Sequence, residues 1–354
     1  MQRTTLKMEE RKGFSALNGW RFLFAMMIIW HHFPDSYKNF SINLDFGNTI
    51  VTFFFILSGF LLTIGYKDKI KSNEISYKDF IRRRISAIFP LQWIMTILFV
   101  IFNINIASYW ALPFHLTLTQ SLIPYWEINF AINTPSWFLS SIFICYLLTY
   151  PILLLFSERK YLFLMSYLIM LMLWNLFLYF LPESIGTRWL CYISPFSRIF
   201  DYSIGIVVGQ YWSSIVKVSQ RFLGNKINAT ILELSIVVAV SCMFYQPLSV
   251  YINNVVIRYI ILFIFIIIFS LSEGVFSRIL GLNLFQYMGS LSIAIYMCHG
   301  FVLHFTNNMD CLSVWNRIII TYILVLIFSY ILKQYCCPYI QNLIVKIACV
   351  NREK

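Results

Sequence analysis

The sequence contains little charge. Only 12% of its 354 residues are charged, whereas 59% are hydrophobic and 19% are aromatic. A typical soluble domain carries about 25% charged residues, so most of this surface is not expected to face water. No polar stretch is long enough to fold as a separate soluble domain. These shortages argue against a soluble protein and predict an integral membrane protein.

The sequence also lacks the cysteine patterns of metal sites and disulfide frameworks. Its eight cysteines are scattered, mostly inside apolar runs, without the paired spacing of zinc ligands. We interpret them as small apolar residues and expect no bound metal. The net charge of +12 is spread over several loops rather than gathered on one domain, so nucleic acid is not an expected partner.

Ten apolar runs are each long enough to cross a hydrocarbon layer of about 30 Å. Because backbone polar groups have no water to bond in lipid, these runs predict helices. We therefore expect an all-α bundle of about ten transmembrane helices. The segment 104–125, which contains two prolines, is expected to be short or re-entrant. The runs lie near residues 18–35, 46–66, 86–103, 135–156, 161–181, 196–213, 229–246, 252–271, 287–305 and 313–334.

The basic residues predict the orientation of the bundle. If the N-terminus is cytoplasmic, 21 of the 27 lysines and arginines fall in cytoplasmic segments, as the positive-inside rule requires. Both termini are then cytoplasmic, with a basic arm at 1–17, one membrane domain at 18–334 and a tail at 335–354. Most of these charges are explained by orientation and by attraction to anionic lipid headgroups.

The first predicted span carries Arg21 and His32, and charged groups inside a span are costly and usually functional. Eleven residues make almost three helical turns, so both side chains lie on one face, about 16 Å apart along the axis. His31 is rotated by about 100° from that face. The alternative is that Arg21 extends to the cytoplasmic interface while the histidines terminate the outer end.

Other predicted spans carry polar groups with simpler interpretations. Ser58 and Gly59 permit close helix packing. Arg82, Arg83 and Arg84 could bind either lipid headgroups or a polyanionic nucleotide. Arg198 and Asp201 form an i,i+3 pair that is expected to be a structural ion pair. His299 lies deep in the ninth span, where an isolated histidine is most often a hydrogen-bonded packing residue.

Taken together, these segments resemble the membrane acyltransferase type 3 superfamily, the O-acetylases of cell-surface polysaccharides. The arginine and histidine of the first span, separated by ten residues, match its signature. The other matching segments are the run from Phe53 to Leu61, Phe80 to Arg84 before Pro90, His115 to Gln120, Pro135 to Ser140 with Tyr146 and Pro151, and Gly289 to His299.

The sequence departs from the family pattern at three positions. Asn18 and Thr52 stand where acidic residues are usual, and Ala87 stands where the basic loop has a further arginine. The first two differences remove carboxylates that would support the histidine, and the third removes one arginine from the expected donor-binding loop.

The resemblance implies transfer of an acyl group, most simply acetyl, from cytoplasmic acyl-CoA to a hydroxyl of a cell-surface or lipid-linked glycan. It implies that His32 is the base and that Arg21 holds the donor, with His299 as a second catalytic acid or base. Arg82, Arg83 and Arg84 would bind the CoA phosphates. Ser58 is grouped with this donor site, where it could also carry the acyl group.

Besides the donor and the acceptor, the expected partners are the lipids of the inner or plasma membrane, which the chain would cross several times. The rival hypothesis is a transporter or flippase for an acylated sugar or lipid-linked glycan. Transporters often contain internal repeats, and none is evident in this sequence.

Overall fold

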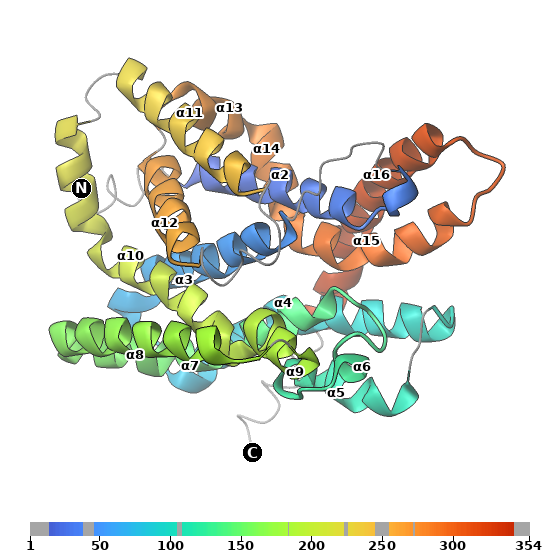
Figure 1. The fold of residues 1–354 in the computed structure, drawn as a ribbon, viewed down its shortest axis with the longest axis horizontal. Coiled ribbons are helices and arrows are strands. Elements are labelled where there is room, and N and C mark those ends of the chain that lie inside the picture. The colour runs from blue at the N-terminus through green and yellow to red at the C-terminus, as the bar shows by residue number, and fades with distance from the viewer. Residues whose placement is uncertain are drawn as a thin grey trace.

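The computed structural model describes residues 14–37, 46–104, 108–182, 184–222, 226–244, 255–271 and 273–342. Within these ranges the chain is helical and contains no strand. Most of the expected basic arm, residues 1–13, and the end of the expected tail, residues 343–354, lie outside the described residues. Figure 1 shows long helices packed into one bundle.

Each predicted apolar run coincides with a helix or with a closely spaced helix pair. The first seven are α2 (Ser15–His31), α3 (Gly47–Lys71), α4 (Tyr77–Ile101), α7 (Ser136–Glu158), α8 (Lys160–Phe180), α10 (Pro195–Phe222) and α11 (Lys226–Met243). The remainder are α12 (Val255–Leu271), the pair α14 (Asn283–Ser290) and α15 (Ser292–Asn307), and α16 (Val314–Ile331).

Six helices in the described residues are long and apolar enough to cross a membrane, or seven if the bent pair α14–α15 is one span. The other predicted runs do not meet this requirement of length and apolar character, and the structure shows why. Helices α2 and α12 have 17 residues each, fewer than the roughly 20 that a straight span needs. Helix α10 carries Arg198 and Asp201 in its first turns. The chain is thus a helical membrane protein, while the count of ten spans and the side of each terminus stay predictions.

The segment after α4 consists of short helices, as expected for 104–125. It contains η2 (Tyr109–Ala111), α5 (Leu112–Thr117), η3 (Gln120–Leu122) and α6 (Trp126–Asn129). His115 is fully buried there, and its Nε2 donates to the Ile128 carbonyl at 2.9 Å. Burial lowers the pKa of His115 to about 4, so this imidazole is neutral at pH 7 and ties α5 to α6.

Helices α3 and α10 form the tightest crossing of the bundle. A Cβ atom on Gly59 would lie 2.1 Å from the Tyr202 carbonyl oxygen, and one on Gly205 would lie 1.9 Å from that of Ile56. Only glycine allows the two backbones to approach so closely. The Ser58–Gly59 step therefore packs α3 against α10, as the sequence predicts.

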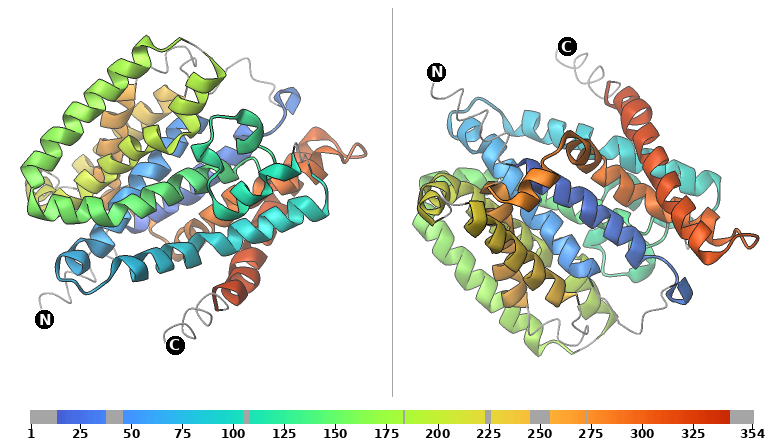
Figure 2. Two further views of the ribbon diagram at one scale, coloured as in Figure 1. Left: turned by 90° about the horizontal axis from the view of Figure 1, so that it is seen from below. Right: turned by 90° about the horizontal axis from the view of Figure 1, so that it is seen from above.

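The ninth run, expected as one span over 287–305, is not one straight helix but a bent helix pair. Helix α14 ends at Ser290, and α15 starts at Ser292 after a bend of 59°. A Cβ on Gly289 would lie 2.0 Å from the Asn18 carbonyl oxygen, so α14 packs directly on α2. The Asn18 Nδ2 donates to the Gln286 carbonyl at 2.8 Å. The break thus lets α14 lie along α2 while α15 pairs with α16, at one end of the bundle (Figures 1 and 2).

Candidate functional site

Helix α2 carries the two residues that the sequence singles out first. It is continuous from Ser15 to His31, and His32 is its C-cap, so the predicted eleven-residue register of Arg21 and His32 is retained. Arg21 lies near the N-terminal end of the helix and His32 lies at the other end, about 16 Å away along the axis. The two residues therefore belong to different ends of one helix face.

The structure brings His32 together with His299 of α15. Their ring centroids are 4.7 Å apart. His32 Nδ1 lies 2.8 Å from the Ile28 carbonyl oxygen, and His299 Nδ1 lies 2.6 Å from that of Tyr296. A carbonyl can only accept, so each Nδ1 must be the donor. In the neutral form of each ring, Nε2 then carries the lone pair that a general base requires.

The two rings differ in access. His32 is exposed, whereas His299 is fully buried, and His299 Nε2 has no hydrogen-bond partner among the described residues. An incoming hydroxyl could therefore reach His32 directly. His299 lies behind it, where its unpartnered nitrogen could act on the first ring.

His31 is directed toward another helix. Its ring packs against the start of α3, where a Cβ on Gly47 would lie 3.0 Å from His31 Nε2. It also contacts the Phe46 ring edge-on, with centroids 5.3 Å apart. The adjacent histidines therefore point in different directions, as predicted, because His31 packs on Phe46 and His32 on His299.

The three consecutive arginines lie inside helix α4 rather than in a loop before it. The helix begins at Tyr77 because the Ser76 side chain caps it, accepting from the Asp79 amide at 3.1 Å. Consecutive residues in a helix point about 100° apart, so the three side chains cannot all converge on one ligand. Arg82 pairs with Asp79 at 3.2 Å, and Arg83 is exposed.

Arg84 is the arginine of this group that is directed into the bundle. Its Nη2 donates to the Tyr66 hydroxyl at 3.0 Å, and its guanidinium lies 5.9 Å from the centre of the Tyr146 ring. Its Nε is buried and has no hydrogen-bond partner. One of its five donors therefore remains available inside the bundle.

Arg84 and Arg21 lie near Tyr146 of α7, Lys333 lies near Arg21, and we call these four residues the cationic cluster. The Tyr146 hydroxyl interacts with the charges of Arg84 and Arg21 and with the Ser58 side chain. Lys333, in the turn η6 (Leu332–Cys336) that continues α16, lies close enough to Arg21 for their charges to interact. The structure thus brings Arg21, Arg84 and Ser58 together and leaves Arg82 and Arg83 outside the cluster.

Two members of the cationic cluster were not singled out as site residues from the sequence. Tyr146 is part of a matching segment but gives no chemical signal on its own. Lys333 reads as one more basic residue after the last span. Its position at the end of an apolar helix is a signal for a charge at the membrane boundary, and only the packing of α16 assigns it to this group.

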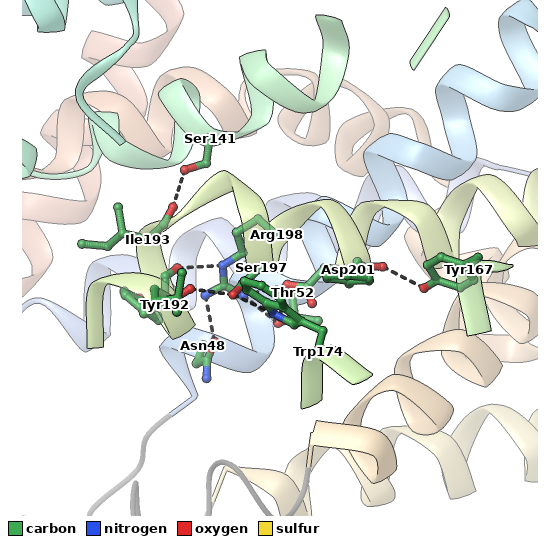
Figure 3. Close-up of polar contacts among 12 residues, drawn as sticks. Asn48, Thr52, Ser141, Tyr167, Trp174, Tyr192, Ile193, Ser197, Arg198 and Asp201 are labelled. Atoms are coloured by element: carbon green, nitrogen blue, oxygen red, sulfur yellow. Dashed lines mark hydrogen bonds and ion pairs between the residues drawn. The ribbon is translucent and has the colours of Figure 1, made fainter. Parts of the chain in front are cut away.

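A second polar group, around Arg198 and Asp201, is structural. Arg198 Nη1 donates to Asp201 at 2.7 Å, and both side chains are at most 4% exposed. Arg198 also donates to the Tyr192 carbonyl, Thr52 and Asn48 (Figure 3). Its charge is therefore matched, as the sequence predicts. Thr52, which replaces a usual acid of the family, lies 3.4 Å from Asp201, so a carboxylate is supplied from α10 instead.

A small cavity of about 30 Å³ adjoins this ion pair, and Trp174, Asn175, Arg258 and Tyr259 are among its lining residues. It has room for about two water molecules. This space is too small for a sugar ring or an acyl chain, so the polar group serves to join α3, α8, α10 and α12.

The fold and these residues define a helical membrane protein that carries ionisable groups at both ends of α2, Arg21 near one end and His32 at the other. A family model described as an acyltransferase domain matches residues 14–334. The chain belongs to this membrane acyltransferase family.

Comparison with characterised proteins gives a partial match. The chain is 36% identical over 114 residues to the acyltransferase MdmB of Streptomyces mycarofaciens. That alignment covers 30% of this chain and 28% of the relative. No solved structure matches the chain.

Proposed function

We propose that this protein transfers an acyl group, most simply acetyl, from cytoplasmic acyl-CoA to a hydroxyl of a cell-surface or lipid-linked glycan. Membership of an acyltransferase family favours this reaction over transport of an acylated sugar. The proposed location is the plasma membrane, or the inner membrane of a cell that has two.

The placement of Arg21, a member of the cationic cluster, and of His32 on one helix is the observation that carries this proposal. Arg21 and His32 are about 16 Å apart along α2. The pantetheine arm of CoA is comparable in length with about five extended residues, which reach roughly 16–18 Å. Phosphates held at the cluster would therefore allow the thioester to reach His32.

The chemical step follows from the lone pair on His32 Nε2. This nitrogen takes the proton from the acceptor hydroxyl as the oxygen attacks the thioester carbonyl carbon. The tetrahedral intermediate then expels the CoA sulfur, and the imidazolium returns the proton to the thiolate. The products are an ester and free CoA, and no further reactant is required.

His299 is proposed to stabilise the protonated form of His32 during this step. When His32 gains a proton, a nearby electron-rich neighbour would stabilise its imidazolium. The bare Nε2 of the buried His299 provides one. This role does not require His299 to touch either substrate.

The proposed function is tested with the protein purified in lipid nanodiscs. It is supplied with acetyl-CoA labelled in the acetyl group and with surface glycan extracted from cells that lack the gene. Transfer of label to the glycan, lost in His32→Ala, is the expected result. Movement of a preformed acylated glycan lipid across the bilayer, without turnover of acetyl-CoA, would instead support the transporter.

A further inference from the structure

The cationic cluster carries three positive side chains whose hydrogen bonds go to neutral groups. Arg21 Nη1 donates to Asn18 Oδ1 at 3.1 Å, Arg84 Nη2 to the Tyr66 hydroxyl at 3.0 Å, and Lys333 Nζ to the Ser290 carbonyl at 2.6 Å. Across the described residues, no carboxylate forms an ion pair with any of the three. The cluster thus concentrates positive charge without an internal counter-charge.

Three other arginines in the same bundle form ion pairs. Arg82 pairs with Asp79, Arg198 with Asp201 and Arg317 with Asp310. Charges of one sign repel, and partly buried charges are costly unless they are paired. Lys333 lies next to Arg21, because the Ser290 carbonyl that it bonds follows Gly289, which packs on Asn18, the partner of Arg21. A site that keeps these positive charges together is therefore arranged for an anion that comes from outside the chain.

We propose that Lys333 is a phosphate ligand of the donor, acting with Arg21, Arg84 and the Tyr146 hydroxyl. This inference rests on the proposed function and deepens it. The ligand class is the phosphate of a phosphorylated pantetheine thioester. The phosphate is either the one on the ribose of CoA or the pyrophosphate that joins the nucleotide to pantetheine.

The competing explanation is that Lys333 only terminates α14. Ser290 is the last residue of that helix, and lysine side chains often bond the last carbonyls of a helix. Three substitutions separate the two roles. Lys333→Gln keeps an N–H donor for the carbonyl but removes the charge, Lys333→Arg keeps the charge, and Lys333→Met removes both. Arg278→Gln, on an exposed residue of α13 (Val275–Leu280), is the matched control for loss of one positive charge.

Kinetics with three donors test the assignment: acetyl-CoA, acetyl-dephospho-CoA and acetyl-pantetheine, which has no phosphate. A charge-assisted hydrogen bond is worth about 10- to 100-fold in affinity. Lys333→Gln should therefore raise the KM for acetyl-CoA by about that factor and leave the KM for acetyl-pantetheine unchanged. Lys333→Arg should recover most of the loss, and Arg278→Gln should match the unmodified protein.

The dephospho donor identifies the source of the phosphate. If the effect of Lys333→Gln disappears with acetyl-dephospho-CoA, Lys333 binds the ribose phosphate. If the effect persists, Lys333 binds the pyrophosphate. Either result supports the proposal.

Two outcomes would overturn it. Lys333→Gln could weaken the use of all three donors equally, which would make Lys333 a structural cap. It could also leave all three unchanged. Calorimetric titration with CoA, and with pantetheine as the reference, tests the same point without turnover. If the unmodified protein transfers no acyl group but its binding of CoA depends on Lys333, the proposed reaction fails and the phosphate site stands.

Discussion

The imidazole rings of His32 and His299 lie with their centroids 4.7 Å apart, although they come from the first and the ninth apolar runs of the chain. The Nδ1 atom of each ring faces a backbone carbonyl of its own helix. Both helices therefore fix their histidine in the tautomer whose Nε2 carries the lone pair rather than the proton. This arrangement makes the two rings a candidate pair of bases at one end of α2.

The adjacent histidines should respond differently to substitution. His32→Ala should reduce acyl transfer by about 10²–10⁴-fold, the usual cost of losing a general base. His31→Ala should retain much of the activity, because its ring packs on Gly47 and Phe46 instead. Turnover of labelled acetyl-CoA measures both, and immunoblots of membranes control for abundance. Equal loss in the two variants would contradict the selection of His32 by its helix face.

The three arginines of α4 should not be equivalent. Arg84→Gln should raise the KM for acetyl-CoA by about 10- to 100-fold, because it removes a charge from the cationic cluster. Arg82→Gln and Arg83→Gln should change it by less than about 3-fold, since exposed charges contribute little. The dependence of initial rate on acetyl-CoA concentration distinguishes them. An effect of Arg83→Gln as large as that of Arg84→Gln would place the phosphates at the helix surface.

The orientation of the bundle is open to a direct test. Reporter domains fused after Asn129 and Asn308 should be external, and those fused after Lys71 and Lys160 should be cytoplasmic. The expectation rests on the 21 of 27 basic residues that fall in cytoplasmic segments. Protease protection in intact cells reads out each position. Reversed results at two of the four sites would contradict the ten-span arrangement.

Local chemistry made much of the fold predictable. Long apolar runs predict helices in lipid because no other structure satisfies their backbone, and each run does coincide with a helix or helix pair. The pairing of Arg198 with Asp201 follows from their spacing alone, and the structure confirms it. The break after Ser290 was not predictable, because it depends on how Gly289 fits against α2.

The candidate site was less predictable than the fold. Motif spacing suggested Arg21, His32 and His299, and the two histidines are indeed neighbours. The directions of Arg82, Arg83 and Arg84 depend on where α4 begins, which the Ser76 cap decides. The place of Lys333 beside Arg21 depends on the packing of the last helix against the first. Neither relationship can be predicted from a single segment of the sequence.

The crossing of α3 and α10 provides a test of the packing with its own control. Gly205→Ala should prevent close approach of the helices, because the new methyl would overlap the Ile56 carbonyl oxygen. We expect a loss of folding stability of about 1–3 kcal/mol, as for an overpacked core. Gly65→Ala, on α3 but with nothing within 4 Å of the new methyl, should be neutral or slightly stabilising. Thermal unfolding in detergent compares the two, and equal melting temperatures would refute the tight crossing.

The role of His299 is separable from donor binding. His299→Phe keeps an aromatic ring in a fully buried position but removes the unpartnered Nε2. It should lower kcat about 10- to 100-fold, because the His32 imidazolium loses its electron-rich neighbour. The KM for acetyl-CoA should not change, since Arg21 of the cationic cluster lies about 16 Å along α2 from His32, the neighbour of His299.

His299→Gln, which retains a hydrogen-bond acceptor, should lose less kcat than His299→Phe. Steady-state kinetics at saturating acceptor measure both constants for the two variants. A rise in KM with unchanged kcat would mean that His299 contacts the donor rather than His32. Identical, full activity in both variants would leave His32 as a base that works without its neighbour.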